Sequence, residues 1–311
     1  MKDIKISFKN FWSGFDYKQC PFYVILCKHY NVQVVNEITN DVDLLFTGVF
    51  SEEDIKQYIG SIKIVTVSYE NTYPNFNAYD YSIGYYNIGI DRNIRLPLFW
   101  YYDFVAKHKL FGERKLLINE PNLSNEIFEQ KDNSIGMVIS NTFRDGMEYL
   151  YPLLESFDFK SGGRFYNNVS LGPDYNDKIE LFETCKFGIA FENADNEDYV
   201  TEKIYDCYVA NTIPIYFGPK NIDNDFNPES FIDVKKYKTS SELIEHIQYL
   251  MHNKEAYMDM LNKKRITNHI NYTARCEEFL INIIENGKIY NHIYGGIDWF
   301  GYGSLYRNNK I

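Results

Sequence analysis

FGIAFENADNEDYVTEKIYDCYVANTIPIYFGP, residues 187–219, contains the pattern that decides the fold of this chain. Its first residues, 187–191, form an apolar run that is short and β-rich enough for a buried strand. Apolar residues then recur at the spacing of one helical face between 201 and 210, and 213–217 predicts a second strand. The sequence therefore predicts a strand-loop-helix-strand unit of an α/β protein.

Glu202 and Lys203 fall in the first turn of this predicted helix. In open α/β sheets, ligands bind beyond the carboxyl ends of the strands, where helix N-termini present free backbone N–H groups. A lysine at the positive end of a helix dipole is unfavourable, and a bound phosphate would offset that cost. A glutamate there could hold ribose hydroxyls or face a developing cation. A capped helix with solvated charges is the alternative, and the residues alone leave both possibilities open.

Three short words of the same stretch point to a family. FEN (191–193), DYVTEK (198–203) and TIPIYFGP (212–219) resemble, in this order and spacing, the donor-site signature of the α1,3/4-fucosyltransferases, glycosyltransferase family 10. The resemblance to bacterial, Helicobacter-type members continues through DFNPESF (225–231). It also extends upstream, where the matching words are ENTYPNFNAYDYSIG (70–84) and RLPLFWYY (95–102).

The resemblance implies an α/β protein of the GT-B type, in which two Rossmann-like domains face each other across a cleft. The length of 311 residues agrees with two domains, because single cores usually stop growing below this size. We expect an acceptor-binding domain at 1–132, a GDP-fucose-binding domain at 133–290 and an aromatic tail at 291–311. Glycines interrupt any helical face in the tail, which favours packing against the body over attachment to a membrane surface.

The implied activity is inverting transfer of L-fucose from GDP-β-L-fucose to an N-acetylglucosamine hydroxyl of a glycan. Family resemblance suggests an α1,3 or α1,3/4 linkage on N-acetyllactosamine or lacto-N-biose units, which gives Lewis-type products. The residues that match the family's donor site are Arg144, Asn193, Tyr199, Glu202 and Lys203. The spacing between Arg144 and Gly162-Gly163 differs slightly from that in relatives, and Arg144 could instead form a surface ion pair with Asp145 or Glu148.

By the same resemblance, the catalytic residues are Glu70 as general base and Glu202 beside the donor. Ionised glutamate is a weak base in water, so this role requires partial burial of Glu70 among Tyr69, Tyr73 and other aromatic residues. A solvated carboxylate at a strand end is the alternative, and relatives often carry glycine at the position of Tyr69. The next candidates for the base are Glu120 and Asp103. Aromatic residues between 73 and 102 could pack on sugar rings, although an aromatic core explains most of them.

Composition and charge bound the remaining functions. We expect no required cofactor, because Arg144 and Lys203 would neutralise the departing diphosphate, and Mn²⁺ or Mg²⁺ would at most stimulate transfer. The net charge of −11 without a basic face argues against nucleic-acid binding. The five cysteines show no zinc-like spacing, and the sequence begins MKDIKISF without the apolar stretch of a signal peptide. These features indicate a cytoplasmic protein with at most peripheral contact with the inner face of the membrane, and they leave its oligomeric state open.

Two other functions remain open at this point. The same fold could use a different nucleotide sugar, or the chain could be a sugar-binding protein of two α/β domains without catalysis. The second alternative would not require Arg144, Glu202 and Lys203 together.

Overall fold

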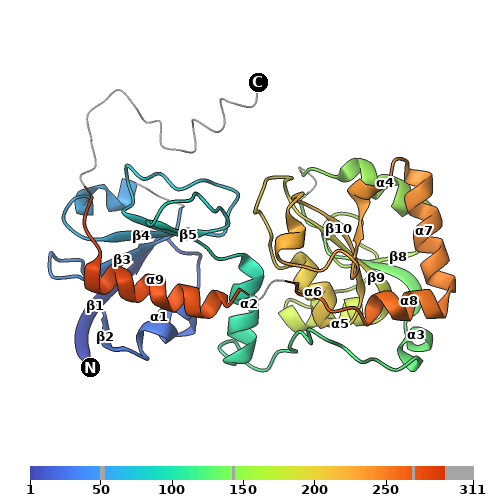
Figure 1. Cartoon of the computed structure of the whole chain (residues 1–311), viewed down its shortest axis with the longest axis horizontal. Coiled ribbons are helices and arrows are strands. Elements are labelled where there is room, and N and C mark those ends of the chain that lie inside the picture. The colour runs from blue at the N-terminus through green and yellow to red at the C-terminus, as the bar shows by residue number, and fades with distance from the viewer. Residues whose placement is uncertain (50–52, 142–143, 268–269, 291–311) are drawn as a thin grey trace, which may run out of the picture. The chain divides into compact units, whose positions relative to one another are not determined.

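The structure, a computed structural model, describes residues 1–49, 53–141, 144–267 and 270–290. The chain divides into two compact units, which we call unit 1 (residues 1–112 and those from 271 onward) and unit 2 (residues 113–270) (Figure 1). Within the described ranges, no helix is long and apolar enough to cross a membrane.

This division differs from the predicted boundaries at 132 and 290. The segment after residue 112 belongs to unit 2 because its backbone is bonded there: the N–H of Leu123 donates to Asn262 Oδ1 at 2.8 Å. Asn119 likewise accepts from the N–H groups of Arg265 and Ile266. Helix 272–286 belongs to unit 1, whereas it was predicted in the second domain. The predicted tail, 291–311, lies outside the described residues.

Unit 1 contains a six-stranded parallel sheet in the order β2-β1-β3-β4-β5-β6. Short apolar runs in the sequence predict four strands before residue 69, at 4–8, 32–35, 43–47 and 62–68. They are confirmed to within about two residues, the usual uncertainty of element ends. The strand bounds are Lys2–Lys9 (β1), Tyr30–Val34 (β2), Leu44–Thr47 (β3), Ile64–Ser68 (β4), Tyr81–Gly84 (β5) and Asn93–Arg95 (β6).

In the N-terminal part of unit 1, the helical segments are shorter than the sequence predicts. The sequence pattern predicts a helix at 17–30 that is broken early by Pro21. The break is confirmed, because a 3-10 turn, Tyr17–Gln19, is followed by α1, Pro21–Leu26, which begins at the proline and ends before residue 30. The pattern at 51–59, with Ser51 as a possible cap, also predicts a helix. The structure has a 3-10 helix there, Glu53–Tyr58, and Ser51 lies outside the described residues. The remaining helices are α2 (Leu98–Lys107) and α9 (Tyr272–Asn286), both of which pack against α1 (Figure 1).

Unit 2 contains a five-stranded parallel sheet in the order β11-β10-β9-β7-β8. Its strands are β7 (Asp132–Met137), β8 (Phe159–Ser161), β9 (Cys185–Phe191), β10 (Ile213–Phe217) and β11 (Ile232–Asp233). Its α-helices are α3 (Glu126–Gln130), α4 (Met147–Ser156), α5 (Tyr175–Glu183), α6 (Lys203–Val209), α7 (Ser240–His252) and α8 (Lys254–Leu261). The predicted unit of strand, helix and strand is confirmed as β9, α6 and β10.

Alternation along β9 explains the layers of unit 2. Phe187, Ile189 and Phe191 point to one face and join the core formed with α4, α7 and α8. Gly188 points to the other face, where a Cβ would lie 2.7 Å from Cys207 Sγ of α6. The helices α5 and α6 therefore lie on one side of the sheet and α4, α7 and α8 on the other (Figure 1).

Candidate functional site

The predicted donor residues gather at the carboxyl ends of β9 and β10. Glu192 directly follows β9, and its N–H donates to Phe217 O at 2.7 Å, which continues the parallel ladder by one residue. Asn193 is the next residue and is exposed. The chain then forms a loop and returns to this edge at Thr201, immediately before α6. Ligands of open parallel sheets bind at such an edge.

Glu192 is the centre of a buried polar network at this edge. Its side chain is fully buried and accepts hydrogen bonds from the N–H of Thr201 at 2.8 Å and from the Thr201 hydroxyl at 2.6 Å. The ammonium group of Lys203 lies 3.1 Å from Glu192 Oε2 and 3.0 Å from Thr201 Oγ1. A buried carboxylate is tolerated only when it is paired and hydrogen-bonded, as it is here.

Arg144 reaches the same edge from the loop before α4. Its Nη2 donates to Phe191 O at 2.9 Å and to Asn193 Oδ1, while its buried Nε has no hydrogen-bond partner among the described residues. Burial lowers the pKa of Arg144, and the charge of Glu192 opposes this effect. The alternative in which Arg144 pairs with Asp145 or Glu148 is not what the structure shows. The guanidinium group is instead held at the end of β9.

Gly146 fixes the geometry of this loop. It has a φ of +83° at the N-cap of α4, and a Cβ there would lie 2.7 Å from the ring of Phe217. Only glycine combines that backbone conformation with such close packing on β10. The position of Arg144 beside the sheet edge therefore depends on the backbone conformation of Gly146, two residues later.

Glu202 occupies the N-cap position of α6 without a side-chain capping hydrogen bond and is partly buried. Burial would raise its pKa, but the positive charges of Lys203 and Lys178 outweigh that effect and hold the pKa below its ordinary value. One helical turn later, Asp206 is fully buried and accepts from Lys178 Nζ at 2.6 Å and from the hydroxyl of Tyr175 at 2.7 Å. The start of α6 thus carries the ionised Glu202, and one turn further along the helix Asp206 pairs with Lys178.

The loop between Glu192 and Thr201 is held at several points. Asp198 has a φ of +66°, and its side chain and N–H both bond to Asn221. The carboxylate of Asp195 lies 2.8 Å from Lys235 Nζ. Tyr199, which we expected to contact the donor, is buried and 3% exposed.

Glu70 lies in unit 1, just after β4, and its side chain is exposed. Its backbone carbonyl accepts from the N–H of Thr72 at 2.7 Å and from the hydroxyl of Ser68 at 3.2 Å, which closes a tight turn. The partial burial among Tyr69 and Tyr73 that the role of base was expected to require is not seen, and the carboxylate is solvent-exposed at the strand end, as in the alternative. Those rings pack elsewhere: Tyr69 on Tyr85 and Tyr101, and Tyr73 on Tyr86.

The other carboxylates considered as a base are engaged in exposed ion pairs. Asp103 lies 2.6 Å from Lys107 one turn along α2, and Glu120 lies 3.3 Å from Lys264. In the part of the chain that the structure describes, no three histidine, cysteine or acidic side chains gather in a way that could hold a metal ion.

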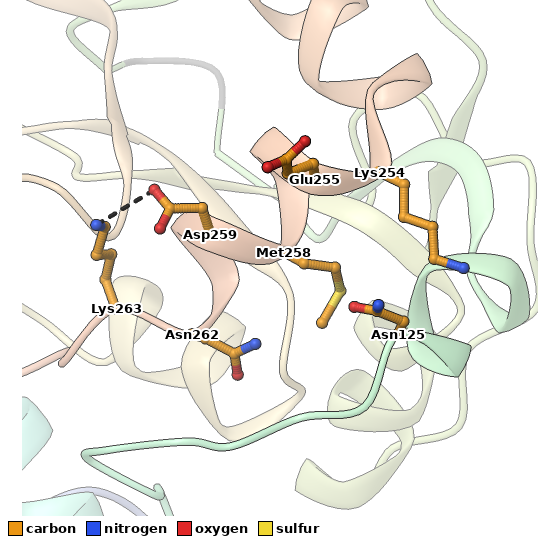
Figure 2. Close-up of a pocket in the computed structure, with 7 residues that line it drawn as sticks. All are labelled: Asn125, Lys254, Glu255, Met258, Asp259, Asn262 and Lys263. Atoms are coloured by element: carbon orange, nitrogen blue, oxygen red, sulfur yellow. Dashed lines mark ion pairs between the residues drawn. The ribbon is translucent and has the colours of Figure 1, made fainter.

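A shallow pocket of about 680 Å³ lies on the flank of α8 (Figure 2). Lys254, Asp259 and Lys263 are among the residues that line it, and Asp259 pairs with Lys263 at 3.2 Å. Tyr257 of the same helix donates to Lys186 O at the start of β9. The helix that carries the pocket thus packs near the start of β9, whereas the donor residues lie at the end of that strand.

Sequence reasoning missed Glu192, Thr201, Lys178 and Asp206 as parts of the site. Glu192 was visible as a charged residue directly after an apolar strand, which is a signal for a buried, paired group. The contact between Lys178 and Asp206 joins residues of α5 and α6, so no local pattern could have revealed it.

Comparison with known proteins agrees with the family resemblance found in the sequence. A sequence profile described as glycosyltransferase family 10 (fucosyltransferase) C-term matches residues 128–284, and one described as alpha-(1,3)-fucosyltransferase FucT N-terminal domain matches residues 6–102. The alpha-(1,3)-fucosyltransferase FucT of Helicobacter pylori is 32% identical over 285 residues, covering 83% of this chain and 59% of that protein. Human 4-galactosyl-N-acetylglucosaminide 3-alpha-L-fucosyltransferase 9 is 31% identical over 147 residues, 45% of this chain and 40% of that protein.

Solved structures agree over nearly the whole chain. A crystal structure of an α1,3-fucosyltransferase has a TM-score of 0.77 and 26% identity, covering 94% of this chain and 93% of that one. A second α1,3-fucosyltransferase structure, with GDP-fucose, has a TM-score of 0.72 and 27% identity, covering 93% of each chain. The expected GT-B type α/β fold is confirmed, although the chain spans only about three fifths of the Helicobacter pylori relative. On these matches, and on the arrangement of residues at the carboxyl edge of unit 2, the chain belongs to glycosyltransferase family 10, the fucosyltransferases.

Proposed function

We propose that the protein is an inverting α1,3-fucosyltransferase that uses GDP-β-L-fucose as donor. The observation that carries this proposal is the pair of cations at the carboxyl edge of unit 2, where Arg144 and Lys203 are held by Phe191 O and Glu192. Two positively charged groups that are fixed beside the carboxyl ends of strands can bind the negatively charged oxygens of a diphosphate. A related α1,3-fucosyltransferase has been crystallised with GDP-fucose and with GDP, which supports this choice of donor.

In the proposed reaction, the bond between the anomeric carbon of fucose and the diphosphate breaks while an acceptor hydroxyl attacks from the opposite side. Arg144 and Lys203 stabilise the negative charge that develops on the departing diphosphate. The bonds from Arg144 Nη2 to Phe191 O and Asn193 Oδ1 hold the guanidinium group at this edge for that role. No metal ion has to supply this charge, and Mn²⁺ or Mg²⁺ would at most stimulate the reaction.

Glu202 has two possible roles in this proposal. Its lowered pKa keeps the carboxylate ionised at neutral pH, so that it can accept from ribose hydroxyls or stabilise positive charge on the fucosyl ring. Asn193 is exposed at the same edge and can contact the sugar or a phosphate. Tyr199 is buried beside them, and we propose that it shapes the wall of the site.

Glu70 is the proposed general base that takes the proton from the acceptor hydroxyl. Its carboxylate is exposed, so an acceptor can reach it, and the turn closed by Ser68 and Thr72 fixes its backbone. Because its side chain is exposed, this role requires that the bound acceptor displace water from it.

The proposed acceptor is an N-acetylglucosamine hydroxyl in N-acetyllactosamine or lacto-N-biose units, which gives Lewis-type glycans. The curated relatives support it, since the name of the human one specifies a 4-galactosyl-N-acetylglucosaminide.

The five cysteines are free thiols in the structure, which supports a reducing compartment and our proposal of a cytoplasmic enzyme.

Incubation of the purified protein with GDP-fucose and each of the two disaccharides tests the proposal, with the product linkage determined by NMR. We expect an α1,3-linked product on N-acetyllactosamine. Parallel incubations with UDP-sugars and other GDP-sugars test the second candidate, a relative with another donor. Binding of the acceptor without any binding of GDP in calorimetry would instead indicate a sugar-binding protein without catalysis.

A further inference from the structure

Glu192 is a negatively charged group at the edge where an anionic diphosphate is proposed to bind, and this placement requires an explanation. Its carboxylate is fully buried and only 3.1 Å from Lys203 Nζ. A negative charge here weakens the attraction of the site for another anion. Its benefit must therefore be something other than affinity for the donor.

The contacts of Glu192 show what it does. It accepts two hydrogen bonds from Thr201, which brings the chain back to the strand edge after the loop, and one from Lys203 two residues later. Thr201 Oγ1 also accepts from the same ammonium group at 3.0 Å. The flexible side chain of Lys203 is thus held at its tip by two oxygen atoms, although lysine normally occupies many rotamers.

Packing holds Glu192 itself in one position. A Cβ added to Gly218, at the end of β10, would lie 3.0 Å from Glu192 Cγ and 2.3 Å from the hydroxyl of Tyr216. Tyr216 and Glu192 therefore share the space left by the absence of a side chain at Gly218. A carboxylate fixed in this way can define the location of the ammonium group that it binds.

We propose that Glu192 is a positioning residue that acts through Lys203. It holds the ammonium group at the donor edge before the donor binds, so that the diphosphate meets a cation already in place. This inference rests on the proposed function, and it adds a residue whose effect on transfer is indirect. The general gain is preorganisation, because a fixed cation need not be ordered during the reaction.

Chemical labelling of lysines tests the free protein, whatever its activity. We expect slow reductive methylation of Lys203 in the wild type and several-fold faster labelling in Glu192→Gln, measured by mass spectrometry. Lys178 and Lys235 are matched internal controls, since both belong to unit 2, form ion pairs and are similarly buried, with 21% and 18% of the side chain exposed. Faster labelling of all three lysines would show general loosening and overturn the proposal, as would unchanged labelling of Lys203.

Single-turnover kinetics tests the effect on transfer. In Glu192→Gln we expect GDP to bind as tightly as in the wild type or more tightly, while the transfer rate falls roughly tenfold. In a Lys203→Met background, the same substitution should reduce the rate no further than about twofold, because the group through which it acts is gone. Equal losses of GDP affinity and rate, repeated in both backgrounds, would mean that Glu192 has only a structural role.

Two further variants keep the result interpretable. Thr201→Val removes one of the two oxygens that hold Lys203 and should slow transfer, while Thr201→Ser, which retains the hydroxyl, should restore it. Asp80→Asn is the control for loss of a buried carboxylate, because Asp80 is fully buried in unit 1 and bonds to the N–H of Ile64. If the wild type shows no transfer but the labelling result holds, the proposed function fails and the positioning of Lys203 stands.

Discussion

At the scale of single residues, Arg144 and Lys203 reach the strand edge by different routes. Arg144 comes from a loop that Gly146 allows to pack on Phe217, and its guanidinium bonds to the end of β9. Lys203 is the first residue of α6 and is bound by Glu192. The two cations differ chemically as well, because a guanidinium can bind two phosphate oxygens at once and an ammonium acts as a point charge.

Replacing either cation by alanine should remove part of the charge stabilisation of the leaving diphosphate. For Arg144→Ala and Lys203→Ala we expect losses on the order of 3 kcal/mol of transition-state stabilisation, roughly a hundredfold in rate. Initial rates of fucose transfer at saturating acceptor measure this loss. Lys254→Ala, at an exposed ion pair with Glu129, is the control and should leave the rate unchanged. Wild-type turnover in either cation variant would exclude the proposed role.

Glu70 provides a second test at this scale. Glu70→Gln preserves the shape of the side chain but cannot take up a proton, so kcat should fall by roughly 10²-fold to 10⁴-fold. GDP affinity, measured by calorimetry, should stay the same because the substitution lies in unit 1 and the donor residues lie in unit 2. Full activity of this variant would require another base, and Asp103 and Glu120 would then have to be released from their ion pairs.

At the scale of elements, buried cations cap the ends of α5 and α6 that lie away from the donor edge. Lys131 Nζ donates to Glu183 O at 2.7 Å, to the Thr212 hydroxyl at 2.9 Å and to Ala210 O at 3.3 Å. Arg265, 1% exposed, donates to Tyr208 O and to Asn211 Oδ1. Carbonyl groups at a helix C-terminus need such donors when water is excluded.

Lys131→Met should therefore destabilise the fold, by about 2 to 4 kcal/mol, because buried acceptors lose their donor. Urea unfolding at pH 7 measures the change, with Lys254→Met as a control at an exposed position. Burial lowers the pKa of Lys131 from 10.5 to about 8. Between these values the unfolded state binds more protons than the folded state, so wild-type stability should rise with pH relative to Lys131→Met. A difference that stays constant from pH 7.5 to pH 10 would contradict this titration.

The sequence predicted the elements well and the contacts between them poorly. Apolar periodicity located β9, α6 and β10, since a strand and a helix differ in period. It could not predict that Glu192 would bind Lys203, because that contact depends on how a loop of several residues returns to the strand edge. The burial that the role of Glu70 was expected to require is not seen for a similar reason: Tyr69 and Tyr73 find aromatic partners beyond their own turn. The position of α9 in unit 1 was also not visible locally.

At the scale of the whole molecule, the proposed charge balance makes one prediction about metal ions. Positive side chains at the donor edge are proposed to neutralise the diphosphate, so EDTA should leave substantial transfer activity. The measurement is the initial rate with EDTA, and then with Mn²⁺ or Mg²⁺ added in excess. Complete loss of activity that Mn²⁺ restores would show that Arg144 and Lys203 are insufficient for this task.

The route of the chain through the two units also has a consequence for synthesis on the ribosome. Unit 2 is continuous from residue 113 to residue 270, whereas unit 1 is completed only by α9. This helix places Tyr272, Cys276, Leu280 and Ile283 in the interior of unit 1. The second unit can therefore fold as soon as it has emerged, while the first, although synthesised earlier, waits with an uncovered apolar surface. We expect this order to reverse the usual N-terminal-first sequence of domain folding, so that unit 1 exposes apolar surface for longer during synthesis than unit 2 does.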